Sequence, residues 1–117
     1  MNKVLVLVLA DTETKEALGR VVNALQTAKE FKEGGDELRL VFDGAGTRWI
    51  GELGSPGHKY HGLFASVKDR AGACGYCAGA FGVKAAVDKH GVPLLEEFDG
   101  HPSLRRAVSD GYQVISF

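Results

Sequence analysis

The sequence has little of several features that would point at once to a function. Its 117 residues include two cysteines, three prolines and one tryptophan, and its formal net charge is −1. The 14 basic and 15 acidic residues alternate along the chain, which predicts no positively charged face for nucleic acid or an anionic membrane. No apolar run approaches the roughly 18 residues that cross a bilayer. We therefore expect a protein that binds neither nucleic acid nor membrane.

The remaining composition is that of a folded chain. Hydrophobic residues make up 44% and charged residues 25% of the sequence, as in globular proteins, and the length predicts a single domain over residues 1–117. The apolar run from Val4 to Ala10 superficially resembles the core of a signal peptide, but it is short and acidic residues follow it. We interpret it as a buried strand and expect a cytoplasmic location. In a reducing cytosol, two cysteines indicate reactivity or metal binding before a structural disulfide.

Strand and helix patterns alternate along the chain. Apolar or β-branched runs predict strands at 4–9, 38–42, 71–76, 92–95 and 112–117. Helical patterns lie between them. The first begins after the cap candidates Asp11, Thr12 and Thr14 and ends at Lys32. The others are at 45–53, 58–68, 77–89 and 103–110. This alternation predicts an α/β fold, a three-layer α/β/α arrangement with a mostly parallel sheet of about five strands. In such sheets, ligands bind at the carboxyl ends of the strands.

The sharpest local signal is the pair Cys74 and Cys77. A C-x-x-C at the start of a helix places sulfur near free backbone N–H groups, which stabilise a thiolate and lower the thiol pKa. The spacing also permits a disulfide or joint binding of a soft metal. Alternatively, the two small side chains simply pack beneath the edge of the sheet.

The segment from Cys74 to Val83, CGYCAGAFGV, resembles the cysteine segment of DsrE-like proteins. The first two strands and the last strand fit the same plan, so the resemblance spans nearly the whole chain. It implies a Rossmann-like domain that forms oligomers. It also implies that Cys74 accepts a sulfane sulfur as a persulfide and passes it to a partner protein, and that Gly82 matches the glycine that ends the short helical stretch. Cys77 departs from the pattern of the sulfur carriers, and a second thiol there could resolve a persulfide into a disulfide.

Two histidines offer a metal-binding alternative. His58 and His61, together with Cys74 and Cys77, supply the ligand types of a tetrahedral zinc site. Their order along the chain is unlike that of common zinc modules, and solvated loop histidines are the ordinary explanation. One of these histidines could instead lie near Cys74 and lower its pKa as an imidazolium.

Other polar residues at the expected strand ends are candidates for the wall of a pocket. They are Asp11, Asp43, Gly44, Gly46 and Arg48. The backbone of the glycine loop could hold an anion beside Arg48, although a tight turn is its simpler role. The two aspartates could equally cap the helices that follow them. We expect a homo-oligomer with Trp49, Tyr60 and Phe64 as interface anchors.

Two functions follow from these residues, and whether the protein is an enzyme stays open. The first is DsrE-like thiol chemistry, with Cys74 as nucleophile, Cys77 as resolving thiol, no cofactor and a sulfur donor or acceptor protein as partner. The second is a non-enzymatic oligomeric module in which the cysteines are structural or bind zinc.

Overall fold

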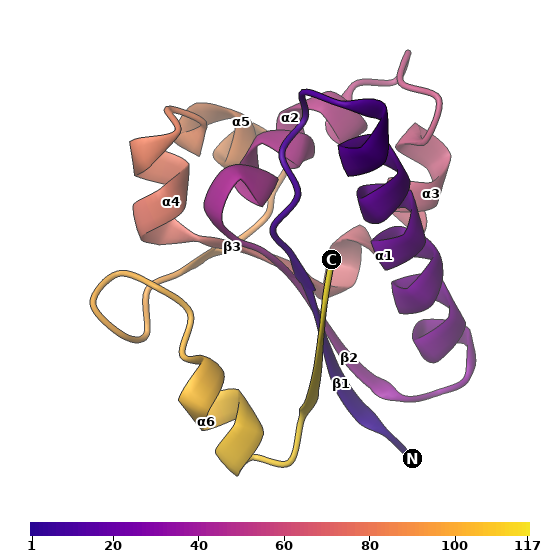
Figure 1. Cartoon of the computed structure of the whole chain (residues 1–117), viewed down its shortest axis with the longest axis vertical. Coiled ribbons are helices and arrows are strands. Elements are labelled where there is room, and N and C mark those ends of the chain that lie inside the picture. The colour runs from indigo at the N-terminus through magenta and orange to yellow at the C-terminus, as the bar shows by residue number, and fades with distance from the viewer.

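The computed structural model describes all 117 residues, and strands and helices alternate along the chain (Figure 1). The five strands are β1 (Lys3–Val8), β2 (Glu37–Phe42), β3 (Ala71–Cys74), β4 (Leu94–Leu95) and β5 (Gln113–Ser116). The α-helices are α1 (Lys15–Glu33), α2 (Trp49–Gly54), α3 (His61–Val67), α4 (Gly75–Ala80), α5 (Lys84–Lys89) and α6 (Leu104–Ser109). The 3-10 helix η1 (Gly44–Arg48) precedes α2, and η2 (Lys68–Arg70) follows α3.

The strands form one parallel sheet in the order β4-β3-β2-β1-β5. This confirms the α/β fold and the sheet of about five strands that the sequence predicts. Phe42 pairs with Ala73, and Cys74 pairs with Leu95. The carboxyl ends of β2, β3 and β4 therefore lie side by side at one edge of the sheet, and the residues that follow these strands meet there.

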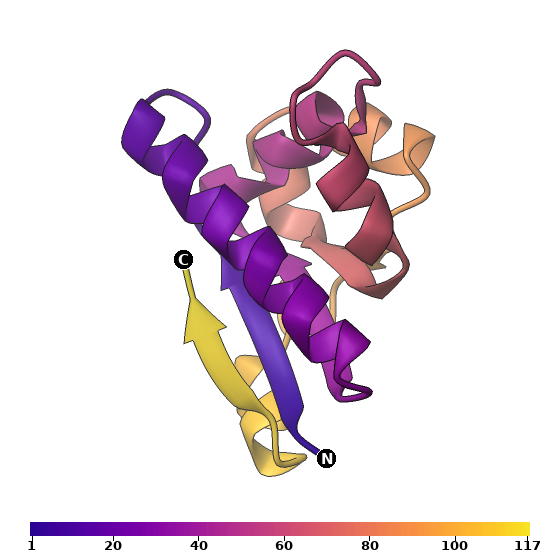
Figure 2. The same ribbon diagram turned by 90° about the vertical axis from the view of Figure 1, so that its right-hand side faces the viewer.

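Helices cover the two faces of the sheet unequally. Helices α1 to α5 contribute to a core of 20 buried residues on one face. The opposite face carries α6 (Figures 1 and 2), and its buried core has four residues, Leu5, Leu7, Val41 and Ala107. β1 is buried on both faces from Val4 to Val8, and its sequence there is continuously apolar and does not alternate. β2 is buried on both faces only from Leu40 to Phe42, and the charged residues Glu37 and Arg39 occupy its first half.

The connection from β2 to α2 depends on two glycines. Gly44 has a φ of 55°, in the left-handed region that glycine adopts without strain. At Gly46, a Cβ atom would collide with the carbonyl oxygen of Val8. These glycines let η1 turn tightly against the end of β1, which is the simpler of the two roles expected for this loop.

The prediction of one continuous helix over residues 77–89 is wrong, because the helix is interrupted. The chain instead forms α4 and α5, separated by Phe81, Gly82 and Val83. Gly82 has a φ of 68°, and a left-handed glycine ends a helix because it turns the chain away from the helical path. The apolar residues keep their helical spacing across this break, so the spacing alone does not reveal the break.

The expected interface anchors are also mostly wrong. Trp49 and Phe64 are 2% and 1% exposed, and both belong to the core of this chain. The indole Nε1 of Trp49 donates a hydrogen bond to the carbonyl oxygen of Ala10 at 2.9 Å. Trp49, the first residue of α2, thus packs against the turn after β1, and it is not available to a second subunit.

None of the helices is both long enough and apolar enough to cross a membrane.

Candidate metal centre

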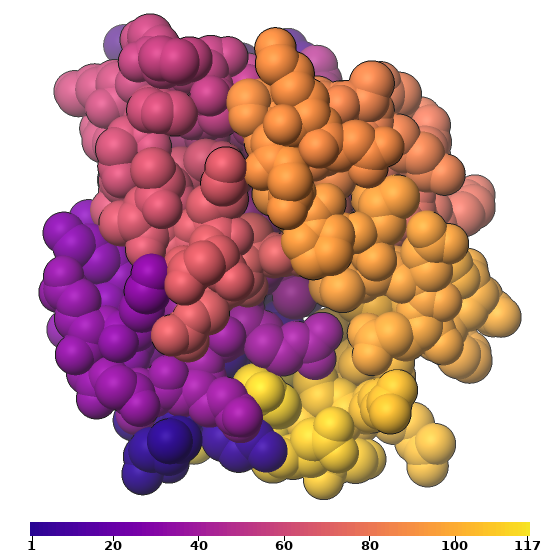
Figure 3. Space-filling view, turned by 180° about the vertical axis from the view of Figure 1, so that it is seen from behind, coloured from indigo at the N-terminus to yellow at the C-terminus, as the bar shows by residue number.

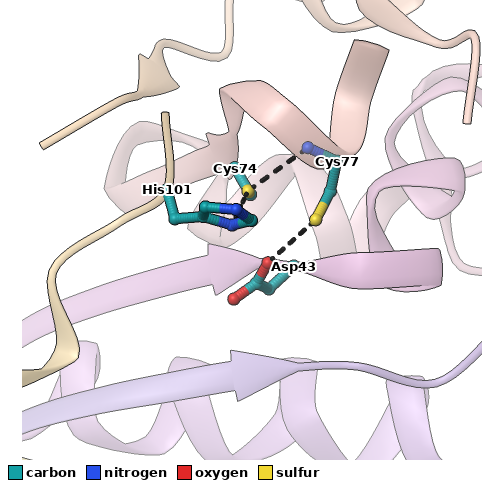
Figure 4. Close-up of side chains that lie close together, drawn as sticks. All are labelled: Asp43, Cys74, Cys77 and His101. Carbon is teal, nitrogen blue, oxygen red and sulfur yellow. Dashed lines mark hydrogen bonds between the residues drawn. The ribbon is translucent and has the colours of Figure 1, made fainter. Parts of the chain in front are cut away.

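Three separate segments bring four side chains together at the carboxyl edge of the sheet (Figure 4). Asp43 follows β2, Cys74 ends β3, and Cys77 lies in α4. His101 comes from the segment between β4 and α6. A carboxylate oxygen, two sulfurs and an imidazole nitrogen of these residues all lie within 4.8 Å of one another.

Cys74 is the buried member of the cluster, with 0% of its surface exposed. It is the N-cap of α4, and its Sγ accepts a hydrogen bond from the backbone N–H of Cys77 at 3.4 Å. Burial raises the pKa of the Cys74 thiol to about 12, the negative charge of Asp43 acts in the same direction, and the N–H of Cys77 opposes them. The expectation that the helix start lowers this pKa is therefore wrong, because one N–H donor does not compensate for the loss of water around the thiolate.

Cys77 and Asp43 form the more accessible side of the cluster. Both are half-buried, and the Sγ of Cys77 donates to Oδ1 of Asp43 at 3.4 Å. The same Oδ1 accepts a hydrogen bond from the backbone N–H of Gly44 at 2.8 Å. Asp43 thus performs the capping role that was weighed for it, at the start of η1, and it also faces the cysteine pair.

His101 is held in place by a tight turn and by an aromatic neighbour. Asp99 and Gly100 have φ values of 50° and 83°, and Phe98 and His101 exchange two backbone hydrogen bonds of 2.8 Å across them. The ring of Tyr76 lies 4.8 Å from the His101 ring. This arrangement directs Nδ1 of His101 to within 3.3 Å of the Cys74 sulfur.

The sequence analysis did not single out His101 as a site residue. The dipeptide Asp99-Gly100 just before it is a strong signal for a turn with two positive φ angles. That signal predicts the turn, but it does not reveal that the turn brings His101 to Cys74, 27 residues earlier.

The two histidines expected at the site lie elsewhere. The ring of His58 packs edge-on against Trp49, with ring centroids 6.4 Å apart. Nδ1 of His61 lies 2.9 Å from the carbonyl oxygen of Leu53. The zinc site of His58, His61 and the two cysteines is therefore not assembled, and neither histidine is the imidazole next to Cys74.

Arg48 and Asp11 pair with each other away from the cluster. Nη1 of Arg48 lies 2.8 Å from Asp11 and 2.9 Å from Glu13, and its contacts with these carboxylates raise the pKa of Arg48. A doubly paired guanidinium is poorly suited to bind a further anion. The cavity next to the cluster includes Asp43 in its wall, and Asp11, Gly44, Gly46 and Arg48 are not among its lining residues.

Comparison with known proteins places the chain among relatives without a described activity. No family model matches it. It is 34% identical over 95 residues to the uncharacterized protein MJ0733 of Methanocaldococcus jannaschii, a match that covers 81% of this chain and 78% of the relative. The chain belongs to the MJ0733 family.

A solved structure supports the fold assigned to this MJ0733-family chain. A conserved protein of unknown function from Bacteroides thetaiotaomicron, BT1422, superposes with a TM-score of 0.61 over 97% of this chain and 94% of its own. The two sequences are 14% identical, so this likeness concerns the fold alone. The chemistry must be argued from the four side chains.

The four side chains of this MJ0733-family protein are suited to a tetrahedral metal ion. Zinc lies about 2.3 Å from sulfur and about 2.0–2.2 Å from nitrogen or oxygen, so that a sulfur and an oxygen or nitrogen bound to one zinc are about 3.5 Å apart. The sulfur of Cys74 lies 3.3 Å from His101, and that of Cys77 lies 3.4 Å from Asp43. Both distances are close to the edge of such a tetrahedron.

Proposed function

We propose that this protein binds one divalent transition metal ion, with Zn²⁺ as the best fit, through Asp43, Cys74, Cys77 and His101. The observation that carries the proposal is the convergence of four ligand atoms of the right types within 4.8 Å. Thiolate and imidazole ligands favour Zn²⁺ over Mg²⁺ or Ca²⁺, which prefer oxygen. This is the zinc alternative predicted from the sequence, with Asp43 and His101 in place of the two histidines expected there.

The electrostatics of the cluster support the proposal. Without a cation, burial and the carboxylate of Asp43 keep Cys74 protonated at neutral pH, because they raise the pKa of its thiol to about 12. A bound dication would neutralise two of the three negative charges of two thiolates and a carboxylate, and it would release the thiol protons. A cation therefore offsets the effects that keep Cys74 protonated, of which burial is the largest.

Elemental analysis tests the proposal directly. Protein produced with added zinc and purified without chelators is expected to contain one Zn²⁺ per chain. His101→Ala and Cys77→Ser are expected to lose most of it, because each removes a ligand. His61→Ala is the matched control, since its ring contacts Leu53, and it is expected to keep the metal. A wild-type chain that holds no zinc, or equal zinc contents in all four proteins, would refute the proposal.

DsrE-like thiol chemistry is the second candidate, and it is favoured by the half-buried Cys77 beside Cys74. In this reaction, the Cys74 thiol takes the outer sulfur of a donor persulfide, which gives Cys74 persulfide and a free donor thiol. Attack by Cys77 on the inner sulfur would then form the Cys74–Cys77 disulfide and release hydrogen sulfide. A mass increase of one sulfur atom on metal-free Cys77→Ser after exposure to a persulfide donor would support this candidate. An unchanged mass would oppose it.

We also propose that the protein is a homo-oligomer located in the cytoplasm. The edge strand β5 supports the proposed oligomer, because all four of its residues are exposed, including Val114 and Ile115. Light scattering on the purified protein tests it, with a mass of 12.5 kDa expected for a monomer and a multiple of it for an oligomer.

A further inference from the structure

A cavity of about 470 Å³ adjoins the four-ligand cluster. Its lining residues are Asp43, Phe98, His101, Pro102, Ser103, Leu104 and Arg105. Asp43 and His101 therefore belong both to the cluster and to the cavity wall, whereas neither cysteine lines the cavity. In Figure 3 the segment from β4 to α6, coloured orange to yellow, forms much of the right-hand side of the view. The cavity is of the size that small organic ligands occupy.

Asp43 is the prospective ligand that is easiest to displace. Its Oδ1 already accepts a hydrogen bond from the N–H of Gly44, so the carboxylate keeps a partner when it leaves a metal. The other three ligands would be two thiolates and an imidazole, which are the three protein ligands of one known class of catalytic zinc sites. In that class, the fourth position is occupied by water or by substrate.

The cavity wall indicates the chemistry of a ligand. Phe98 is 65% exposed and Leu104 is half-buried, so both offer apolar surface, whereas Pro102 lines the cavity but is buried. Arg105 is the basic residue in the wall. Its neighbour Arg106 pairs with Glu97 at 3.7 Å, whereas Arg105 has no carboxylate partner. A molecule that contacts these residues would combine a short apolar body with a negative charge.

Resting on the metal function proposed above, we infer that the cavity binds a small organic anion whose donor atom replaces Asp43 on the metal. In this exchange, the bond from the metal to the Asp43 oxygen breaks and a bond from the metal to the donor atom of the ligand forms. Asp43 keeps its capping bond with Gly44. Cys74, Cys77 and His101 hold the metal throughout, and Arg105 faces the negative charge of the ligand.

Cobalt substitution with a thiol probe tests this inference. Co²⁺ bound by thiolates absorbs light by charge transfer from sulfur, and the absorbance increases with the number of thiolates. The probe is 3-mercaptopropionate, whose thiol loses its proton to solvent on binding the metal and whose carboxylate supplies the negative charge that Arg105 is proposed to face. We expect the charge-transfer absorbance of the Co²⁺ protein to rise about 1.5-fold at saturation, as three thiolates replace two.

Substitutions in the cavity wall test how much each side chain contributes to binding of the probe. Arg105→Ala is expected to weaken probe binding about two- to fivefold, the range of an exposed ion pair. Arg20→Ala, which removes the same charge from helix α1, is the matched control and is expected to bind the probe as the wild type does. Asp43→Asn keeps a good capping residue and removes the competing carboxylate, so it is expected to bind the probe more tightly.

The outcomes separate this inference from the proposed function. A two-thiolate cobalt spectrum that the probe leaves unchanged would overturn the inference and leave the metal site standing. Loss of the whole spectrum on addition of the probe would also overturn it, because the probe would then remove the metal. A protein with no cobalt–thiolate absorbance at all would refute the proposed metal function itself.

Discussion

The reactivity of Cys74 in the metal-free protein distinguishes a metal ligand from a nucleophile. In Cys77→Ser, Cys74 is the sole thiol of the chain. Its environment raises its pKa from an ordinary value of 9.0 to about 12. Of the causes, only the contact with the Cys77 side chain is altered by this substitution, and burial, the largest cause, remains. We therefore expect the thiol to stay almost entirely protonated at pH 8.

The expected size of the effect follows from that pKa. At pH 8, the thiolate fraction falls about 1,000-fold when the pKa rises by three units. A more basic thiolate is also a better nucleophile. With a Brønsted coefficient of about 0.4–0.5, three pKa units increase the reactivity of the thiolate itself by a factor of about 16 to 32. The net expectation is a reaction with a disulfide reagent that is up to about 30- to 60-fold slower than that of an unperturbed thiol, because Cys77→Ser removes one of the contacts that raise the pKa. Exclusion of the reagent from the buried site would slow it further.

The assay is the reaction of chelator-treated Cys77→Ser with 5,5′-dithiobis(2-nitrobenzoate) between pH 7 and 9.5. We expect the rate to rise about tenfold per pH unit without a plateau, because the pKa of Cys74 lies above this range. The same variant unfolded in urea provides the unperturbed thiol, and Cys74→Ser reports the half-buried Cys77. A plateau below pH 8.5 in the folded protein would refute the reasoning and favour a nucleophilic Cys74.

Three further measurements test the site and the fold. Free Zn²⁺ at 100 times its dissociation constant is expected to stabilise the wild type by about 2.7 kcal/mol and to raise its Tm by about 10 °C. His101→Ala should show no such shift in differential scanning calorimetry, and an equal shift would contradict the ligand assignment. Gly46→Ala is expected to lower the free energy of unfolding by about 2 kcal/mol or more, because its Cβ would collide with Val8. The matched change Gly19→Ala, in open space on α1, should raise it by about 0.5–1 kcal/mol in urea titrations; similar effects at both positions would contradict this account. Above pH 9, folded metal-free protein keeps the Cys74 proton that the unfolded chain loses, so its stability should fall by about 1.4 kcal/mol per pH unit more steeply than that of Cys74→Ala. Parallel stability curves for these two proteins would show that the folded thiol titrates normally.

Local patterns were sufficient to predict most of the fold. The run from Val4 to Leu9 contains too little polarity for an exposed strand, and most of it forms β1, an interior strand of the sheet between β2 and β5. Thr14 was one of three cap candidates, and its side chain accepts the N–H of Ala17. These features depend on residues that are close in the sequence, where periodicity and capping chemistry act directly.

The sequence predicted three residues of the candidate site, Asp43, Cys74 and Cys77, but not His101. The cysteine pair is a local motif, and Asp43 was placed at the same edge because β2 was recognised as a strand. The strand before His101 was predicted, over 92–95, and β4 forms at its end, but His101 lies beyond it in a connecting segment without a periodic pattern. Its position depends on how that strand pairs with β3, and the choice among four histidines therefore required the structure.

The origin of the four prospective ligands in three separate segments has a consequence for folding kinetics. In the unfolded chain, only Cys74 and Cys77 are close in sequence, whereas Asp43 is 34 residues from Cys77 and His101 is 27 residues from Cys74. The complete ligand set exists only after β2, β3 and β4 have paired. Under the proposed metal function, a metal ion would therefore bind late in folding, and interactions that form after the transition state slow unfolding without accelerating folding. Zinc would mainly slow the unfolding of the assembled sheet and so lengthen the lifetime of the native state.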